Sequence, residues 1–265
     1  SYILYKTGKL SEKGQGMPDW LLPANVTPAI FLLLVVISFF TSALTAAFGI
    51  GGGVAMLGAL AGTVPTATVV AVHAVVQLGS NFGRVVIQRH HILWREAAIF
   101  TVGSCLGAAA GGLVFVALPE KVLLALLGAF ILLLTWVPKP RIPGLETAGM
   151  AIGGFVATFI TIFVGSTGSF VQALFLQMKL EKRALVASHA ACMVIQHGLK
   201  MIVFGILGFS FADWLPLLAA MIAAGFVGTW MGTQLLERMP EQLFNRILKA
   251  VLTLVSLDLL RRAIW

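Results

Sequence analysis

Two apolar stretches of the chain carry polar and cationic side chains at helical spacing. In the first stretch the residues that share one helix face are His73, Gln77, Asn81 and Arg84. In the second stretch they are His189, Gln196, His197 and Lys200. A charge inside a membrane-spanning helix costs at least about 2.5–3.5 kcal/mol, so it is a functional-site hypothesis by default. Because both charges are cationic, this pattern favours the binding of an anion.

These residues also have simpler interpretations. Arg84 lies five residues from the end of its predicted helix and could extend its side chain to the membrane surface. Lys200 is followed by roughly eight apolar residues, so the same explanation is harder to apply to it. A single histidine on such a face is more often a packed, hydrogen-bonded residue than a ligand. Because His73 and His189 lie at matching positions of the two stretches, a role as ligand and a role in packing are equally good interpretations.

Two glycine-rich segments offer a second set of anion ligands. Glycine costs a helix interior about 1 kcal/mol relative to alanine, so FGIGGG at 48–53 and VGSTGS at 164–169 predict breaks. Unwound backbone at membrane depth is tolerated only where it is buried in protein or lines a wet cavity. The helix after each break presents free N–H groups and its positive dipole end, which favour an anion. The predicted ligands are Gly51, Gly52, Gly53, Ser166, Thr167, Gly168 and Ser169.

Glycines can instead permit close helix packing, as pairs separated by three residues do. We assign this role to the pairs at 107–111 and 228–232, and we assign the anion-site role to the two breaks.

Composition identifies the environment of these segments. Hydrophobic residues make up 59% of the 265 residues and charged residues 11%, against about 45–50% and about 25% in soluble domains. The mean hydropathy is +0.98. A soluble globule this apolar could not cover its own surface, so a soluble enzyme, a nucleic-acid-binding module and a disordered chain are excluded. The sequence predicts an all-α polytopic membrane protein.

The apolar segments fall into two sets on either side of a polar linker. A membrane-spanning helix needs about 20 apolar residues. The segments lie near 28–48, 54–64, 66–88, 95–117 and 120–137, and then near 147–164, 169–178, 183–207, 214–236 and 241–262. The second segment of each set is too short to cross a membrane alone, so it predicts half of a broken or re-entrant helix. The predicted organisation is an added leader at 1–16, a first repeat at 17–137, a linker at 138–146 and a second repeat at 147–265.

The two sets resemble each other in sequence. A shift of 116 residues places His73 on His189 and Arg84 on Lys200, and a shift of 121 places the Pro-Glu pair at 119–120 on that at 240–241. We infer two homologous repeats, each with four to five membrane segments including the glycine-rich broken helix. The loop at 84–95 in the first set is basic, whereas its partner at 205–213 in the second set is not. The opposite holds for the loop at 63–66, which is uncharged, and its partner at 179–183, which is basic. This favours inverted repeats over parallel ones.

The positions of the acidic residues indicate the charge of the cargo. Almost all lie at loops or helix ends, and only Asp258 lies within an apolar stretch, beside Arg261 and Arg262. A cation pathway would place carboxylates at mid-depth, so an anion is expected. An intramembrane enzyme and a non-transporting scaffold are the alternatives from other classes. The segment at 165–168 has Thr167 where intramembrane serine proteases have serine, and no His-Glu-x-x-His motif is present.

The paired motifs resemble those of a known family. FGIGGGVAML followed by a helix with His, Asn and Arg, and then GSTGSF followed by a helix with two His and Lys, look like the TauE/SafE sulfite exporter family. The resemblance covers residues 28–262. It implies a bacterial inner-membrane permease for sulfite or organosulfonates such as sulfoacetate, and uptake of another small organic anion is the alternative.

We therefore expect a multi-pass transporter with one anion site near the membrane midplane, where the two breaks meet. The expected partners are a small anion and the lipid bilayer, with proton coupling through the histidines and a homodimer as further hypotheses. No cofactor, no metal and no nucleic acid are expected.

Overall fold

The computed structural model describes residues 18, 21–23, 25–113 and 145–264, together with 121, 125, 128, 129, 132, 133, 135 and 136. Within this part of the chain the structure is helical throughout and contains no strand. Five of its helices are long and apolar enough to cross a membrane: Pro28–Phe48, Ala67–His91, Trp94–Leu113, Lys182–Ile206 and Ala212–Arg238. The leader at 1–16, most of the segment at 120–137 and the linker up to residue 144 lie outside the described residues.

The helices follow the expected segments closely. The first half contains α1 (Pro28–Phe48), α2 (Gly52–Ala61), α3 (Thr66–Gln88), the short 3-10 helix η2 (Arg89–His91) and α4 (Trp94–Leu113). The second half contains α6 (Leu145–Val164), α7 (Gly168–Leu176), α8 (Lys182–Ile206), η3 (Ala212–Trp214), α9 (Leu215–Arg238) and α10 (Glu241–Ile264). The helices α2 and α7 have only 10 and 9 residues, and at about 1.5 Å per residue neither can cross a bilayer.

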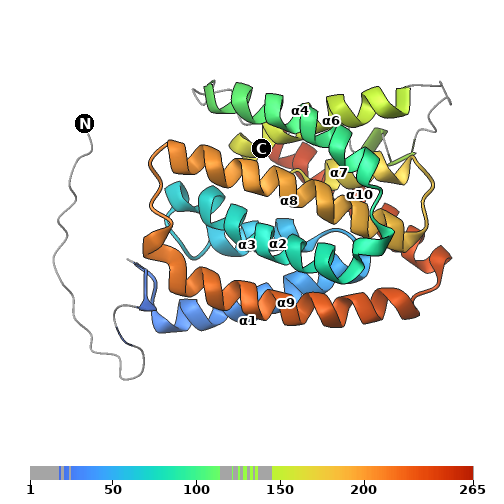
Figure 1. Ribbon diagram of the computed structural model, residues 1–265. Coiled ribbons are helices and arrows are strands. Elements are labelled where there is room, and N and C mark those ends of the chain that lie inside the picture. The colour runs from blue at the N-terminus through green and yellow to red at the C-terminus, as the bar shows by residue number, and fades with distance from the viewer. Residues whose placement is uncertain are drawn as a thin grey trace.

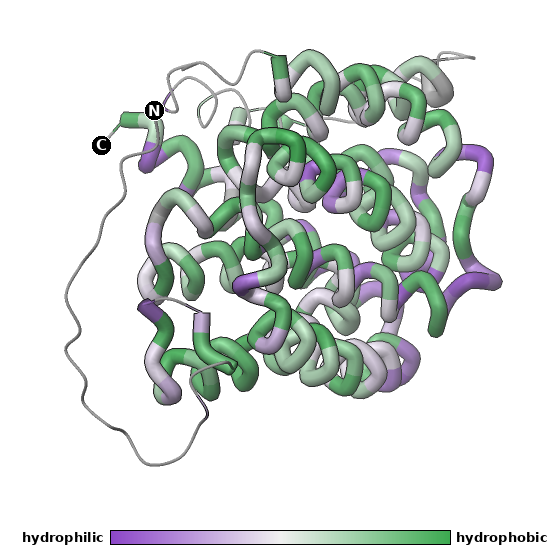
Figure 2. The backbone as a smooth tube through the Cα atoms, turned by 60° about the vertical axis from the view of Figure 1, so that its left-hand side comes forward, coloured by the Kyte–Doolittle hydropathy of each residue, from purple (hydrophilic) through white to green (hydrophobic). Residues whose placement is uncertain are grey.

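The long helices form layers (Figure 1). In that view α4 and α6 pack together at the top, α1 and α9 pack together at the bottom, and α3 and α8 cross the molecule between these two pairs. The surface of the bundle is apolar: Phe40, Val102 and Ile152 are all more than 60% exposed. The tube in Figure 2 shows the same distribution, with apolar helices and hydrophilic residues gathered mainly at loops. This surface suits contact with lipid.

Glycine-backed contacts hold the outer pairs together. A Cβ atom at Gly107 of α4 would overlap the carbonyl of Phe155 in α6, and one at Gly228 of α9 would overlap the carbonyl of Phe39 in α1. Gly232 meets the Ala43 carbonyl in the same way. At these positions the missing side chain lets two backbones touch. The packing role assigned to the pairs at 107–111 and 228–232 is therefore confirmed.

Both breaks depend on glycine for their backbone conformation. The α1 helix ends at Gly49 with φ +77°, and Gly51, with φ +101°, precedes α2. In the second half Gly165 has φ +86° directly after α6. These left-handed values are costly for a residue with a Cβ atom. The chain turns here, and α2 and α7 begin at the turns.

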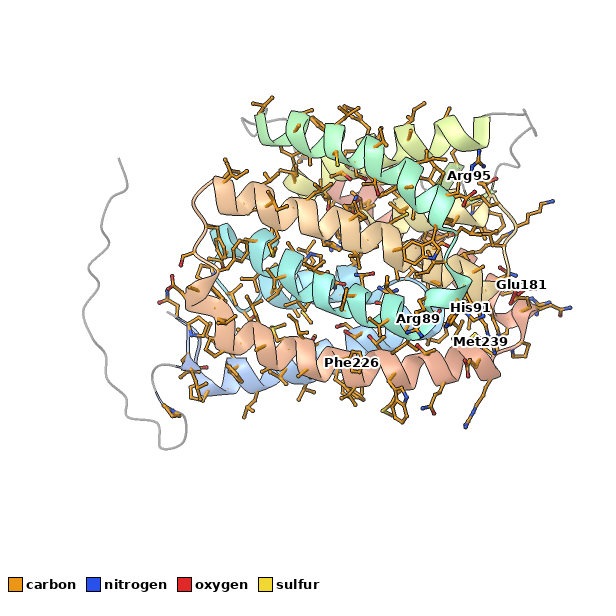
Figure 3. All side chains as sticks on the ribbon, in the orientation of Figure 1. Arg89, His91, Arg95, Glu181, Phe226 and Met239 are labelled. Atoms are coloured by element: carbon orange, nitrogen blue, oxygen red, sulfur yellow. The ribbon has the colours of Figure 1, made fainter. Side chains whose placement is uncertain are left out.

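The α3–α4 and α8–α9 connections lie at opposite ends of the bundle (Figure 1). Figure 3 shows Arg89, His91 and Arg95, which belong to the connection between α3 and α4, at the right-hand end, together with Glu181. The connection between α8 and α9 lies at the left-hand end (Figure 1). The α3–α4 connection carries Arg89 and Arg95, whereas the charged residue of the α8–α9 connection is Asp213, so the right-hand connection is the more basic of the two.

Candidate functional site

A small cavity lies where the two breaks meet. Its lining residues come from both halves of the chain: Thr45, Ile50, Gly51, Gly53, Val54, Gln77, Asn81, Arg84, Ser166, Gly168, Ser169, His189, Met193 and His197. The cavity measures about 30 Å³ as space for the centres of water molecules, and about 10–15 Å³ on this measure holds one water. The site as it stands therefore accommodates only a very small group of atoms.

The starts of α2 and α7 face each other across this space. A Cβ atom at Gly53 would lie 3.7 Å from Ser166 Oγ, and one at Gly168 would lie 3.7 Å from His189 Nε2. The first turns of the two short helices thus lie beside polar groups of the other elements. Their free N–H groups and dipole ends favour negative charge in this region.

Two histidines hold the first turns of the short helices in place. His73 Nε2 lies 2.9 Å from the carbonyl oxygen of Gly53, and His189 Nε2 lies 3.0 Å from that of Gly168. A carbonyl oxygen only accepts, so in each ring Nε2 is the donor. The Nδ1 atoms of both rings are buried and have no hydrogen-bond partner. The ring of His197 packs edge-on against His73, with centroids 5.7 Å apart.

Arg84 is the one lysine or arginine among the lining residues of the cavity. Its side chain is 0% exposed, and its guanidinium donates to Asn81 Oδ1 and to the carbonyl oxygen of Thr45 at 3.5 Å. Its Nε atom is buried without a partner, as is Ser169 Oγ. No carboxylate is among the lining residues. The cavity therefore combines unpaired donors with a buried positive charge.

Lys200 lies next to the site without lining it. This side chain is also 0% exposed, and Nζ donates to the carbonyl oxygen of Gly165 at 2.7 Å. Gly165 is the left-handed residue that ends α6, so the ammonium group is bound to the second break itself. The described part of the chain pairs neither Lys200 nor Arg84 with a carboxylate.

The structure brings ten of the fifteen sequence-predicted residues to the cavity: Gly51, Gly53, Gln77, Asn81, Arg84, Ser166, Gly168, Ser169, His189 and His197. The other five do not line it. Gly52 packs against α1, where a Cβ atom would overlap the Thr41 carbonyl. Thr167 donates to the Ala157 carbonyl and lies 3.2 Å from Gln196 Oε1. His73 and Lys200 support the breaks from behind.

Four lining residues were not predicted. Thr45 follows Thr41 by one helix turn on α1, and this spacing of hydroxyls near a break is a signal that the sequence offers. Ile50, Val54 and Met193 have no such signal, because apolar residues that line a cavity look the same in sequence as those of a core.

Comparisons with known proteins identify the family. A model of the family described as sulfite exporter TauE/SafE matches residues 34–259. No curated protein and no solved structure matches the chain. The matched range contains both breaks, all the cavity-lining residues and the two buried cations. This chain of membrane helices belongs to the TauE/SafE sulfite exporter family, a family of membrane permeases for anions.

Proposed function

We propose that the chain moves small sulfur-containing oxoanions, sulfite or organosulfonates such as sulfoacetate, across the membrane through the central cavity. The observation that carries this proposal is Arg84: a buried guanidinium faces a cavity where two helix N-termini meet and no carboxylate is among the lining residues. A buried charge without a partner is costly, and an anionic cargo supplies that partner.

The donors around the cavity suit a compact oxoanion. Sulfite and the head of a sulfonate each present three oxygens around one sulfur. Backbone N–H groups at the starts of α2 and α7, the hydroxyls of Ser166 and Ser169, and the guanidinium of Arg84 approach from different sides. Because the cavity is so small, side chains such as Met193 must move when the anion binds. The size favours sulfite over larger sulfonates.

We also propose that the two halves are inverted repeats with α2 and α7 as re-entrant half-helices. Three observations support this arrangement. Both halves have a long helix, a glycine break and a short helix in the same order. His73 and His189 each bond to the first turn of the short helix in their own half. The equivalent connections at η2 and η3 lie at opposite ends of the bundle (Figure 1).

The inverted arrangement predicts the outcome of a labelling experiment. Single cysteines replacing His91 and Ala212, which are both exposed, should react with a membrane-impermeant thiol reagent from opposite sides of the membrane. The exposed native Cys105 is replaced by serine beforehand, and this background chain is the control. If both cysteines react from the same side, the repeats are parallel.

A thermal-shift screen tests the cargo. Purified protein is heated with sulfite, sulfate, taurine, sulfoacetate or simple carboxylates, each as its sodium salt at equal ionic strength. An anion that binds only the folded state stabilises it by about 2.7 kcal/mol at a concentration of 100 Kd. We expect sulfite to raise the Tm most. A response to carboxylates alone would favour the alternative function, uptake of another small organic anion.

The remaining parts of the proposal follow from the family and the site. We place the protein in the bacterial inner membrane, as the family resemblance implies. His189 and His197 line the cavity and His73 lies behind it, so these imidazoles are the candidates for proton coupling, since imidazole titrates near neutral pH. A homodimer remains a hypothesis for the purified protein, to be tested by its mass in detergent.

A further inference from the structure

A second, larger cavity lies at the other end of α7. It measures about 610 Å³ and is lined by Thr135, Trp136, Leu176, Gln177, Lys179, Leu180, Glu181, Leu185, Glu241, Asn245 and Lys249. The end of the bundle where it opens is the basic one, where Figure 3 labels Glu181 and Met239. The central cavity lies at the start of α7, and this one lies at its end. The 9 residues of α7 therefore connect the two.

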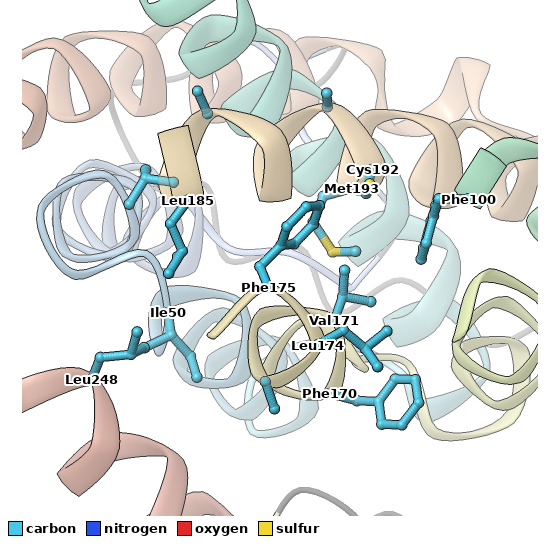
Figure 4. Close-up of a cluster of buried hydrophobic side chains, with 14 of the residues drawn as sticks. Ile50, Phe100, Phe170, Val171, Leu174, Phe175, Leu185, Cys192, Met193 and Leu248 are labelled. Carbon is cyan, nitrogen blue, oxygen red and sulfur yellow. The ribbon is translucent and has the colours of Figure 1, made fainter. Parts of the chain in front are cut away.

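The layer between the two cavities is apolar. Ile50 lines the central cavity and Leu185 lines the second cavity, yet both belong to one buried apolar cluster with Leu248 of α10. Figure 4 shows Ile50, Leu185 and Leu248 together at one side of this cluster. Buried apolar side chains of this cluster therefore lie between the central cavity and the second cavity. Side chains of this kind close a path by excluding water.

One polar residue interrupts this layer. Gln172 is 0% exposed, and among the described residues neither its Nε2 nor its Oε1 has a hydrogen-bond partner. It lies three residues after Ser169, which lines the central cavity, and four before Leu176, which lines the second cavity. At this spacing the three residues share one face of α7. A buried amide without a partner is destabilising, and packing alone does not explain its presence.

The Gln172 amide also lies against the first break. A Cβ atom at Gly49 would overlap Gln172 Nε2, so the amide occupies the place where another residue would carry its side chain. Movement of the break around Gly49 would therefore change the surroundings of the Gln172 amide directly.

We propose that the second cavity is a vestibule, through which the anion travels between the central site and the basic end of the molecule. On this route the Gln172 amide donates a hydrogen bond to the anion as the anion passes Ile50, Leu185 and Leu248. This inference rests on the proposed function. Lys179 and Lys249 of the vestibule attract the anion. Of the two carboxylates there, that of Glu241 already accepts from the backbone N–H of Lys182.

The test compares flux with equilibrium binding. The full chain in liposomes carries Gln172→Leu, which removes the amide, or Gln172→Glu, which adds a negative charge to the route. The control is Gln88→Leu, which removes another buried amide that is hydrogen-bonded to Thr233 and lies outside both cavities. We expect sulfite flux through Gln172→Leu to fall about tenfold, because one hydrogen bond is lost from the barrier state. Flux through Gln172→Glu should fall further, while the Kd of Gln172→Leu and the flux of Gln88→Leu stay unchanged.

The outcomes separate this inference from the proposed function. If the parent chain neither binds nor moves sulfite, the proposed function fails. If the parent chain moves sulfite and both Gln172 variants match it, the route along α7 is wrong and the proposed function stands. A weaker Kd in Gln172→Leu would place Gln172 in the central site and overturn the inference. Should Gln172→Leu not fold, Gln172→Asn, which shortens the reach of the amide, replaces it and must also lower flux.

Discussion

Sulfite is expected to bind the Arg84→Met variant about 10 to 150 times more weakly than it binds the parent chain, because a charge-assisted hydrogen bond contributes about 1.5–3 kcal/mol. Arg84 is the cation among the cavity-lining residues, and its Nε atom has no partner in the described part of the chain. Methionine has a similar length and no charge, so it removes the attraction without opening a large hole. The measurement is the Kd for sulfite from the Tm at increasing sulfite concentrations.

The unliganded variant should keep a Tm close to that of the parent, since the gain from replacing a buried charge by an apolar side chain is offset by the loss of the donor to Asn81 Oδ1. Lys200→Met should behave differently. Lys200 does not line the cavity, and its loss frees the Gly165 carbonyl, so this variant should lose stability and less of its affinity. Arg246→Met removes an exposed cation and serves as the control. Equal sulfite affinity in Arg84→Met and the parent would exclude Arg84 from the site.

Gly168→Ala is expected to weaken sulfite binding about 10- to 200-fold, the usual cost of one extra carbon in a fitted pocket. The new methyl group would lie 3.6 Å from Met193 Sδ and 3.7 Å from His189 Nε2, which are ordinary contacts. It therefore fits the folded chain and takes space from the cavity. The backbone at Gly168 has no left-handed φ, so the variant should be about 0.4–1 kcal/mol more stable.

Two other glycines provide the comparison for Gly168→Ala. A Cβ atom at Gly58 of α2 meets nothing within 4 Å, so Gly58→Ala should raise stability and leave the Kd unchanged. Gly52→Ala should lower stability by about 1–3 kcal/mol through overpacking, because its methyl group would overlap the Thr41 carbonyl. Kd and Tm are measured for all three variants in one detergent. An unaltered Kd in Gly168→Ala would mean that the anion binds away from α7.

The sequence predicted the helices well because strong local signals delimit them. The expected segments 28–48 and 66–88 have the same bounds as α1 and α3, since glycine follows the first and a Pro-Thr step begins the second. The glycine runs correctly predicted two short helices after breaks. The bounds of α2 were less accurate, because glycine runs do not show where helical hydrogen bonding resumes.

The cavity was predicted less completely, because neighbouring residues in a break face different ways. Gly51, Gly52 and Gly53 are consecutive, yet only Gly52 leaves the cavity lining, because it packs against the Thr41 carbonyl of α1. The sequence shift of 116 residues places Arg84 on Lys200, but only Arg84 lines the cavity. Residue type and spacing select the helix face, and the contacts between helices decide which side chains of that face reach the cavity.

The glycine-backed contacts determine which parts of the molecule can move past each other. The α1 helix of the first half is locked to α9 of the second, and α4 of the first half is locked to α6 of the second. Each half therefore contributes one helix to each of the two tightly packed outer pairs. One half cannot rotate away from the other without separating backbones that touch at Gly107 and Gly228. A motion that keeps these backbone contacts moves α1 together with α9 and α4 together with α6, and each pair contains the helix that leads into one of the two breaks.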